Sequence, residues 1–169
     1  MSRWDQIVQV RPHLLAYARS LADTAADAED LVSDALERAG RSADIPGEPD
    51  ALKRWLFRVI RNLNIDELRK RRVRREYADG VDRHWNGGEA QAHGPEDAVL
   101  VRLALEALKP QQRELLVLVD VLGMTYAEAG AVMDVPHGTV MSRVSRARRA
   151  LLAKLETVGD RPPQRTREG

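Results

Sequence analysis

Apolar side chains recur every three or four residues along most of the 169-residue chain, and this spacing is typical of amphipathic helices. It predicts helices over residues 4–21, 24–39, 51–72, 96–108, 110–122, 125–133 and 136–155. Pro12 lies inside the first segment, where it is expected to bend or divide the helix. Aromatic residues make up only 4% of the chain, so leucine, valine and alanine are expected to fill the core. The pattern therefore predicts an all-α protein.

Signals for helix ends are densest between residues 124 and 137. Thr125 and Glu128 have the spacing of a capping box, in which the threonine oxygen accepts from a first-turn amide and the glutamate reaches back. The tripeptide Asp134-Val135-Pro136 ends this short helix, because proline lacks an amide donor and disfavours helical geometry in the residue before it. A short capped helix, a tight turn and a longer helix together predict a helix-turn-helix.

The last predicted helix has two distinct faces. The face expected to be buried carries Val140, Val144, Ala147, Leu151 and Leu155. A second face, roughly 140° away at about 100° per residue, carries Thr139, Ser142, Arg143, Arg146 and Ala150. Arginines beside short side chains suit a DNA groove, since they reach guanine edges or phosphates while the small residues allow close approach. A solvated surface helix is the alternative, and the preceding capped helix and turn favour DNA binding.

The formal net charge of +1 conceals a strong segregation of charge along the chain. Residues 22–50 hold nine acidic residues and two arginines, whereas residues 51–76 hold ten basic and three acidic residues. Residues 136–157 are again basic, with five basic residues and one acidic residue. One acidic surface and two separate basic surfaces indicate more than one macromolecular partner.

Several classes of protein are excluded or disfavoured. The chain has no cysteine, which excludes disulfides and thiolate metal sites and fits a cytoplasmic location. No apolar run approaches the roughly 20 residues of a membrane span, and the first residues lack a signal-peptide core. The four histidines do not cluster, and no nucleotide-binding, hydrolase or zinc-protease motif is present. We therefore expect a protein with no catalytic residue, metal or cofactor.

Two segments lack helical periodicity. Residues 77–95 (YADGVDRHWNGGEAQAHGP) contain four glycines, so they are predicted to be a linker. Residues 158–169 are polar and proline-rich, and they are expected to be disordered. The chain is thus predicted to form two small helical domains, residues 1–76 and 96–157, joined by a flexible tether.

Three blocks, in this order, resemble the extracytoplasmic-function (ECF, group IV) sigma factors, the small two-domain promoter-specificity subunits of bacterial RNA polymerase. The first, DAEDLVSDALERA (residues 27–39), is similar to their polymerase-binding helix. The second, WLFRVIRNLNIDELRKRR (residues 55–72), is similar to the helix that binds the promoter −10 element. Residues 108–151, which begin LKPQQRELLVLVDVLG, are similar to their −35-binding domain. The resemblance covers about residues 10–157 and implies a region 2-like domain followed by a region 4-like helix-turn-helix domain.

This resemblance implies core RNA polymerase as a partner, contacted at the coiled coil of its β′ clamp and at its β flap. The clamp contacts implied on the acidic helix are Asp27, Glu29, Asp30, Leu31 and Asp34. Acidic residues early in a helix also stabilise its positive end by about 0.3–1 kcal/mol each, and Leu31 has the alternative of supporting the fold. An anti-sigma protein is a further partner that the family implies.

The third helix is expected to bind the −10 element, where promoter DNA becomes single-stranded. The contacts implied are Arg54, Trp55, Arg58, Arg61, Asn62 and Arg69. Asn62 offers a donor and an acceptor to a base edge, and a pocket for an extruded base is implied between residues 40–50 and the start of this helix. Trp55 has two interpretations, a base-stacking residue or a core residue at the edge of the apolar stripe. The basic run 69–75 is expected to touch phosphates, with a solvated face as the alternative.

The −35 element is expected to bind the last helix. The contacts implied are His137, Thr139, Met141, Ser142, Arg143 and Arg146. Met141 stands where the family usually has lysine or arginine, so one donor and one positive charge are missing, and weaker or differently specific binding is expected. Asp134 replaces the usual glycine of the turn, and aspartate tolerates left-handed backbone geometry better than most residues.

The resulting hypothesis is an alternative sigma factor that binds core RNA polymerase and directs promoter-specific transcription initiation, with the polymerase supplying the chemistry. The alternative is a sigma-like mimic that sequesters an anti-sigma protein without initiating transcription. The basic faces of the third and last helices favour the first hypothesis, because a mimic has no need of them. An ordinary helix-turn-helix repressor would leave the acidic helix unexplained.

Overall fold

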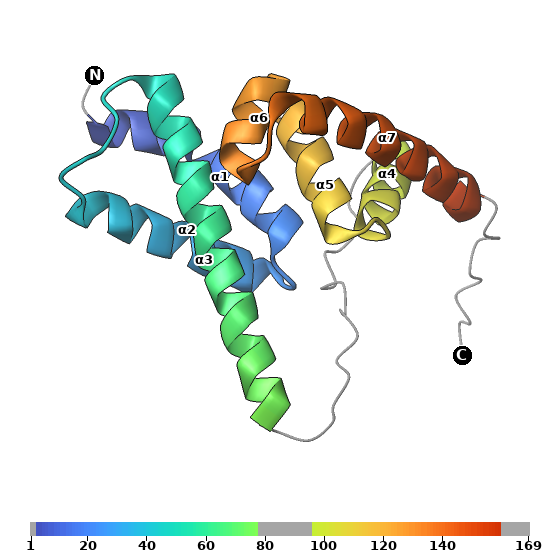
Figure 1. Cartoon of the computed structure of the whole chain (residues 1–169), viewed down its shortest axis with the longest axis horizontal. Helices are drawn as coiled ribbons and strands as arrows, with labels where there is room; N and C mark the ends of the chain where they lie inside the picture. Colours follow the sequence, from blue (N-terminus) through green and yellow to red (C-terminus); the bar gives the residue numbers. More distant parts are fainter. Residues whose placement is uncertain (1–2, 78–95, 160–169) are drawn as a thin grey trace.

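The computed structural model describes residues 3–77 and 96–159, and these residues form helices connected by short turns (Figure 1). The α-helices are α1 (Arg3–Leu21), α2 (Ala25–Arg41), α3 (Pro49–Tyr77), α4 (Glu96–Glu106), α5 (Pro110–Leu116), α6 (Tyr126–Met133) and α7 (His137–Gly159). A π-helical turn, η1 (Val117–Val121), follows α5 directly. The described residues contain no β-strand, and the predicted all-α class is confirmed.

Helices α1, α2 and α3 pack against one another to form the N-terminal domain. Thr24 caps α2, since its side-chain oxygen accepts a hydrogen bond from the Asp27 amide at 3.0 Å. The buried face of α2 consists of Ala28, Val32, Ala35 and Ala39. At the centre of the domain, the rings of Tyr17 and Phe57 meet edge-on with centroids 5.0 Å apart, a favourable aromatic geometry.

Two helices of this domain differ from their predicted extents. α1 is one helix that contains Pro12, so the proline does not divide it, because the buried residues Ile7 and Leu14 anchor both halves to the same core. α3 continues five residues past the predicted end at Arg72. Ion pairs between side chains one turn apart support this polar extension, as between Arg72 and Glu76 at 3.2 Å.

The C-terminal domain consists of α4 to α7, and most of its predicted helix boundaries are confirmed. Pro110 occupies the first turn of α5, and Gly123 has a φ of +69° after η1. The capping box of Thr125 and Glu128 opens α6, with both of its hydrogen bonds present. Asp134 ends α6 in the left-handed conformation (φ 58°, ψ 47°), as expected for the residue that replaces glycine in this turn.

Gly130 allows the close contact of the helix-turn-helix. A β-carbon at this position would lie 2.6 Å from the backbone oxygen of Val135 and 3.3 Å from Cγ2 of Val140. The buried stripe of α7 is as predicted, with Val140, Val144 and Ala147 fully buried and Leu151 and Leu155 partly buried. This stripe packs α7 against α4, α5 and α6, and leaves the opposite face of its N-terminal half exposed.

The two domains pack against each other. Helix α6 lies on α3, and α5 and η1 lie against α1 (Figure 1). One continuous apolar cluster contains residues of both domains, including Leu14 and Leu56 of the first and Leu118 and Val132 of the second. The C-terminal end of α3 extends beyond the other helices (Figure 1). The sequence indicated a tether between the domains and gave no sign that the two domains pack against each other.

The predicted linker and tail fall largely outside the described residues. Tyr77, the first residue of the predicted linker, is the last residue of α3, and residues 78–95 are not described. The first two residues of the predicted tail, 158 and 159, are the last two of α7, and residues 160–169 are not described. The domain boundaries 1–76 and 96–157 therefore stay predictions.

Candidate nucleic-acid and partner interfaces

The exposed face of α7 carries the side chains that the sequence assigned to DNA. His137, Met141, Ser142, Arg143 and Arg146 are exposed, and Thr139 is partly buried. The guanidinium of Arg146 lies along the helix, with Nη2 donating to the Ser142 hydroxyl at 3.4 Å. These residues share one face because the buried stripe of α7 fixes the rotation of the helix.

A cavity of about 550 Å³ lies beside this face, between α7 and the start of α5. It is lined by Arg143 and Arg146, and also by Lys109, Gln111 and Gln112. These last three residues are not among those that the sequence pattern predicted for the site. Their proximity to α7 depends on the tertiary packing of α5, which no local pattern reveals.

Not every basic residue of α7 faces this surface. Arg148 forms a two-pronged ion pair with Asp120 of η1, with nitrogen–oxygen distances of 2.6 and 3.1 Å. The pair holds α7 against η1, and the hydrogen bonds that Arg148 donates to Asp120 raise the pKa of Arg148 above its usual value. Arg148 is therefore a structural residue, distinct from Arg143 and Arg146.

The α3 residues assigned to the −10 element divide into two groups. Arg58, Asn62 and Arg69 are exposed, whereas the other three are partly buried. Arg54 Nη1 lies 3.0 Å from Glu128 Oε1 of α6, and Trp55 packs against the apolar cluster. Of the two interpretations of Trp55, the position in this structure matches a core residue at the edge of the apolar stripe.

Arg61 and Glu114 form the most buried ion pair that joins the two domains. Arg61 Nε donates to Glu114 Oε1 at 2.9 Å, and their side chains are 19% and 6% exposed. The same oxygen accepts a hydrogen bond from the Tyr17 hydroxyl at 2.7 Å. Burial and the negative charge of Glu114 raise the pKa of Tyr17 well above its usual range, so the phenol stays a donor. Beside this site, Arg113 Nε donates to the carbonyl of Ser20 at 2.8 Å.

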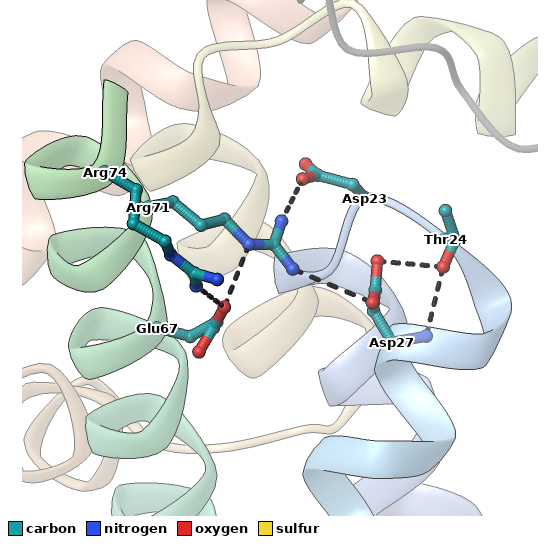
Figure 2. A network of polar contacts seen from close by, with 6 residues as sticks. All are labelled: Asp23, Thr24, Asp27, Glu67, Arg71 and Arg74. Atoms are coloured by element: carbon teal, nitrogen blue, oxygen red, sulfur yellow. Dashed lines mark hydrogen bonds and ion pairs between the residues drawn. The ribbon is translucent and has the colours of Figure 1, made fainter. Parts of the chain in front are cut away.

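The residues assigned to polymerase binding lie on α2, beside a network of charges that Figure 2 shows. Arg71 of α3 contacts Asp23 at 2.7 Å, Glu67 at 3.2 Å and Asp27 at 3.7 Å. Asp27 also accepts a hydrogen bond from the Thr24 hydroxyl at 2.8 Å (Figure 2). Asp27 thus has a structural role at the start of α2, in line with the helix-end alternative.

The other acidic residues of α2 are more accessible. Glu29 forms an ion pair with Arg11 of α1 at 3.0 Å, while Asp30 and Asp34 are exposed. Leu31 is partly buried, and together with Asp30 and Asp34 it lines a cavity of about 300 Å³ between α2 and α3.

Within the described ranges, 3–77 and 96–159, no helix is long and apolar enough to cross a membrane. The same ranges contain no cluster of three or more His, Asp or Glu residues that could hold a metal ion.

Both domains match models of one protein family. Residues 7–74 match the model described as Sigma-70 region 2, and residues 98–151 match the model described as Sigma-70, region 4. ECF RNA polymerase sigma factor EcfG of Rhodopseudomonas palustris (strain TIE-1) is 37% identical over 155 residues, which are 92% of this chain and 86% of the relative. This chain belongs to the ECF RNA polymerase sigma factors.

Further relatives of this sigma factor agree. ECF RNA polymerase sigma factor SigC of Mycobacterium tuberculosis (strain CDC 1551 / Oshkosh) is 37% identical over 130 residues, or 76% of this chain and 70% of that one. The solved structure of sigma factor RpoE from Bartonella quintana, in complex with the anti-sigma factor NepR, is 34% identical, with a TM-score of 0.77 over 93% of this chain and 97% of that chain. The sigma factor is a transcription regulator that binds core RNA polymerase and directs promoter-specific initiation.

Proposed function

We propose that α7 binds the −35 element through Thr139, Ser142, Arg143 and Arg146, with His137 and Met141 at the edge of the contact. The observation that carries this proposal is the geometry of the helix-turn-helix. The left-handed turn at Asp134 and the buried stripe of α7 together turn these side chains outward. A helix presented in this way enters the major groove with its N-terminal residues at the base edges.

The same proposal assigns the −10 element to α3. Arg58 and Arg69 supply positive charge to phosphates, and the exposed amide of Asn62 can donate to and accept from a base edge. Arg54 and Arg61 belong to the same surface, although they are paired with Glu128 and Glu114 of the C-terminal domain in this structure, and Trp55 follows Arg54 on the same helix. Opening the duplex costs a few kcal/mol per unstacked step, so a binding surface for the exposed bases is needed in return.

We assign core-polymerase binding to the acidic face of α2, with the coiled coil of the β′ clamp as its target. Asp30 and Asp34 are the best candidates because they are exposed, and Leu31 lines the cavity beside them. Asp27 and Glu29 are weaker candidates because each already has an ion pair within the domain. The β flap of the polymerase is the expected contact of the C-terminal domain. This function belongs in the cytoplasm, and the polymerase supplies all the chemistry.

An anti-sigma protein is a further partner in this proposal. The support is the likeness to the Bartonella quintana sigma factor RpoE, which was solved in complex with the anti-sigma factor NepR. The match covers 93% of this chain, so it includes both domains.

Run-off transcription tests the proposed function. Core RNA polymerase is combined with the purified sigma factor and a library of genomic fragments, and promoter-dependent transcripts are sequenced. The expected result is a shared pair of −10 and −35 sequences upstream of the start sites. Tight core binding with no promoter-dependent transcript from any fragment contradicts the proposal and favours a sigma-like mimic.

Arg146→Ala tests the −35 surface at one side chain. Promoter affinity of the holoenzyme is expected to fall by about 1–3 kcal/mol if Arg146 reads a base. Lys154→Ala is the matched control, because it removes a positive charge from an exposed position near the C-terminal end of the same helix, away from the N-terminal half that carries the proposed contacts. Equal losses in the two variants, or no loss in Arg146→Ala with an intact fold, remove Arg146 from the site.

A further inference from the structure

The basic run at the end of α3, residues 69–75, is not uniform in its exposure. The side chains of Arg69, Arg72 and Arg74 are 77%, 83% and 69% exposed, as expected of residues that meet solvent or phosphates. The side chain of Arg71 is only 33% exposed, and Arg71 is the one basic residue of the run that is partly buried. The sequence predicted phosphate contacts or a solvated face for the run as a whole, and Arg71 fits neither.

Arg71 directs each of its three guanidinium nitrogens at a different carboxylate. Nη1 lies 2.7 Å from Asp23, in the turn between α1 and α2, and Nη2 lies 3.7 Å from Asp27 on α2. Nε lies 3.2 Å from Glu67, one turn earlier on α3 (Figure 2). A DNA phosphate that approached Arg71 would meet the combined negative charge of these three groups, so this arginine is poorly suited to a backbone contact.

These ion pairs connect the second half of α3 to the rest of its domain. The buried residues of α3 are Leu52, Leu56, Phe57 and Ile60. Leu63 is the last residue of the helix that packs against the apolar cluster, and beyond it the cavity of about 300 Å³ separates α3 from α2. Among the described residues, Arg71 makes the only ion pairs that lead from residues 66–77 to another helix or turn. The other ion pairs of this stretch join side chains of α3 to one another.

We propose that Arg71 is a positioning residue for −10 recognition, which clamps the second half of α3 to the turn between α1 and α2 and does not touch DNA itself. The clamp consists of the ion pairs of Arg71 with its three carboxylates. The proposal rests on the proposed function of α3. A helix end without tertiary packing is marginal in water, because packing supplies most of the stability of a helix in a protein. The clamp therefore keeps Arg69 in a helix that continues from Arg58 and Asn62.

The geometry of the clamp favours arginine over lysine. A guanidinium presents five N–H donors in a planar fork, whereas lysine places its charge on one nitrogen at the end of a flexible stem. A lysine at this position serves fewer of the three carboxylates. A phosphate contact is different, because lysine binds phosphate well as a point charge. Arg71→Lys therefore separates the two roles, since it keeps the charge that a phosphate needs and weakens the clamp.

Hydrogen exchange in the free full-length protein measures the clamp directly. The amides of residues 66–77 are expected to exchange about tenfold faster in Arg71→Lys than in the wild type, because this end of the helix opens more often. The amides of α7 are an internal reference and should exchange at the wild-type rate. Arg72→Lys is the matched control, because Arg72 pairs with Glu76 of the same helix, and it should match the wild type throughout.

Promoter affinity of the holoenzyme measures the consequence for DNA binding. Promoter fragments recovered by run-off transcription are titrated with sigma factor at a saturating concentration of core polymerase. Arg71→Lys is expected to bind roughly three- to tenfold more weakly than the wild type, the scale of a partly exposed network of ion pairs. Arg72→Lys should keep its affinity. Wild-type exchange in Arg71→Lys overturns the clamp, and faster exchange with wild-type promoter affinity overturns its role in −10 recognition.

Asp23→Asn tests the clamp from its other end, and it replaces Arg71→Lys if that variant loses the circular dichroism signal of the folded protein. The substitution removes a negative charge, and charge alone would strengthen binding to DNA. The clamp predicts the opposite, namely weaker promoter binding and faster exchange of residues 66–77. Stronger promoter binding overturns the proposal. Glu37→Gln is the matched control, because Glu37 is an exposed acid of α2 that pairs with Arg41 of the same helix.

The double variant with Asp23→Asn and Arg71→Lys shows whether the two residues act together. Its loss of promoter affinity is expected to be smaller than the sum of the two single losses, because both substitutions weaken the same contact. Additive losses would mean that the residues act independently, which contradicts the clamp. If the wild-type holoenzyme binds no promoter fragment, the proposed function fails instead, and hydrogen exchange in the free protein still decides whether Arg71 holds α3.

Discussion

At the scale of single residues, Glu128 takes part both in the capping box of α6 and in an ion pair with the N-terminal domain. Its Oε2 accepts from the amide of Thr125 at 2.9 Å and closes the capping box, while its Oε1 accepts from Arg54 of α3 at 3.0 Å. The hydrogen bond from the Thr125 amide, and with it the pairing to Arg54, lowers the pKa of Glu128 below its usual value. One carboxylate therefore starts α6 and fixes it against the other domain.

This lowered pKa predicts how stability depends on pH. A carboxyl group whose pKa is lower in the folded state stabilises that state above its unfolded pKa of about 4.3, and loses this effect as the pH falls through the folded pKa. The difference in free energy of unfolding between the wild type and Glu128→Gln is therefore expected to be largest at neutral pH. It should shrink as the pH falls below about 4, measured by urea unfolding at a series of pH values. A difference that is constant with pH would show that the charge of Glu128 contributes nothing.

Met141 is the residue at which this sigma factor departs from the usual family pattern on its DNA face. Its side chain is 54% exposed, so an arginine fits there without any repacking. Met141→Arg is expected to strengthen binding to promoter fragments recovered by run-off transcription by roughly three- to tenfold, and to steepen the slope of log affinity against log salt by about 0.9. Met141→Leu, which adds no charge, should leave the salt slope unchanged. An unchanged slope in Met141→Arg would place position 141 away from the phosphates.

At the scale of helices, sequence signals predicted those ends that local chemistry determines. Thr24 and Thr125 cap α2 and α6, and Asp134 adopts the left-handed conformation that the turn requires. The π-helical turn η1 was missed, because the run of apolar residues around Val117 fits an α-helix and a π-helix equally well.

The sequence could not predict which residues pair with the charged side chains on α3. Arg54 and Arg61 have the same pattern as any solvated basic face, and their partners lie 74 and 53 residues further along the chain. Glu114 sits in a short amphipathic helix, where a glutamate is normally exposed. The sequence was thus enough to list the candidate DNA-binding residues. It was not enough to predict that two of them, Arg54 and Arg61, form ion pairs with the C-terminal domain.

The close approach of α6 to the turn leads to a prediction about the helix-turn-helix as an element. Gly130→Ala is expected to lower the free energy of unfolding by about 1–3 kcal/mol, because the new β-carbon meets the rigid backbone oxygen of Val135 at 2.6 Å. Gly138→Ala is the control, since no atom lies within 4 Å of its β-carbon. Urea unfolding compares the two variants. Equal stability would mean that the turn relaxes to admit the methyl group.

At the scale of the whole molecule, the surface proposed for polymerase and the contact between domains are separate. Asp30 faces the cavity between α2 and α3, whereas Glu114 and Glu128 lie where the C-terminal domain meets α1 and α3. A change at Asp30 should therefore affect polymerase binding without disturbing the contact between the domains.

Asp30→Arg tests this separation. The affinity for core polymerase is expected to fall about tenfold or more, since a like charge replaces an attractive one at the contact. The free energy of unfolding in urea should stay close to that of the wild type, because Asp30 is exposed. A large loss of stability in Asp30→Arg would show that the substitution disturbs the fold instead.

The ion pairs of Arg54 and Arg61 also bear on competition from the bacterial chromosome. A basic protein free in a cell meets on the order of 10⁶ or more non-specific DNA sites, and each phosphate that it neutralises adds to its retention there. In this arrangement of the two domains, the arginines that are paired with Glu128 and Glu114 are withdrawn from such contacts. Non-specific DNA therefore competes mainly for the exposed basic side chains of α3, such as Arg58 and Arg69.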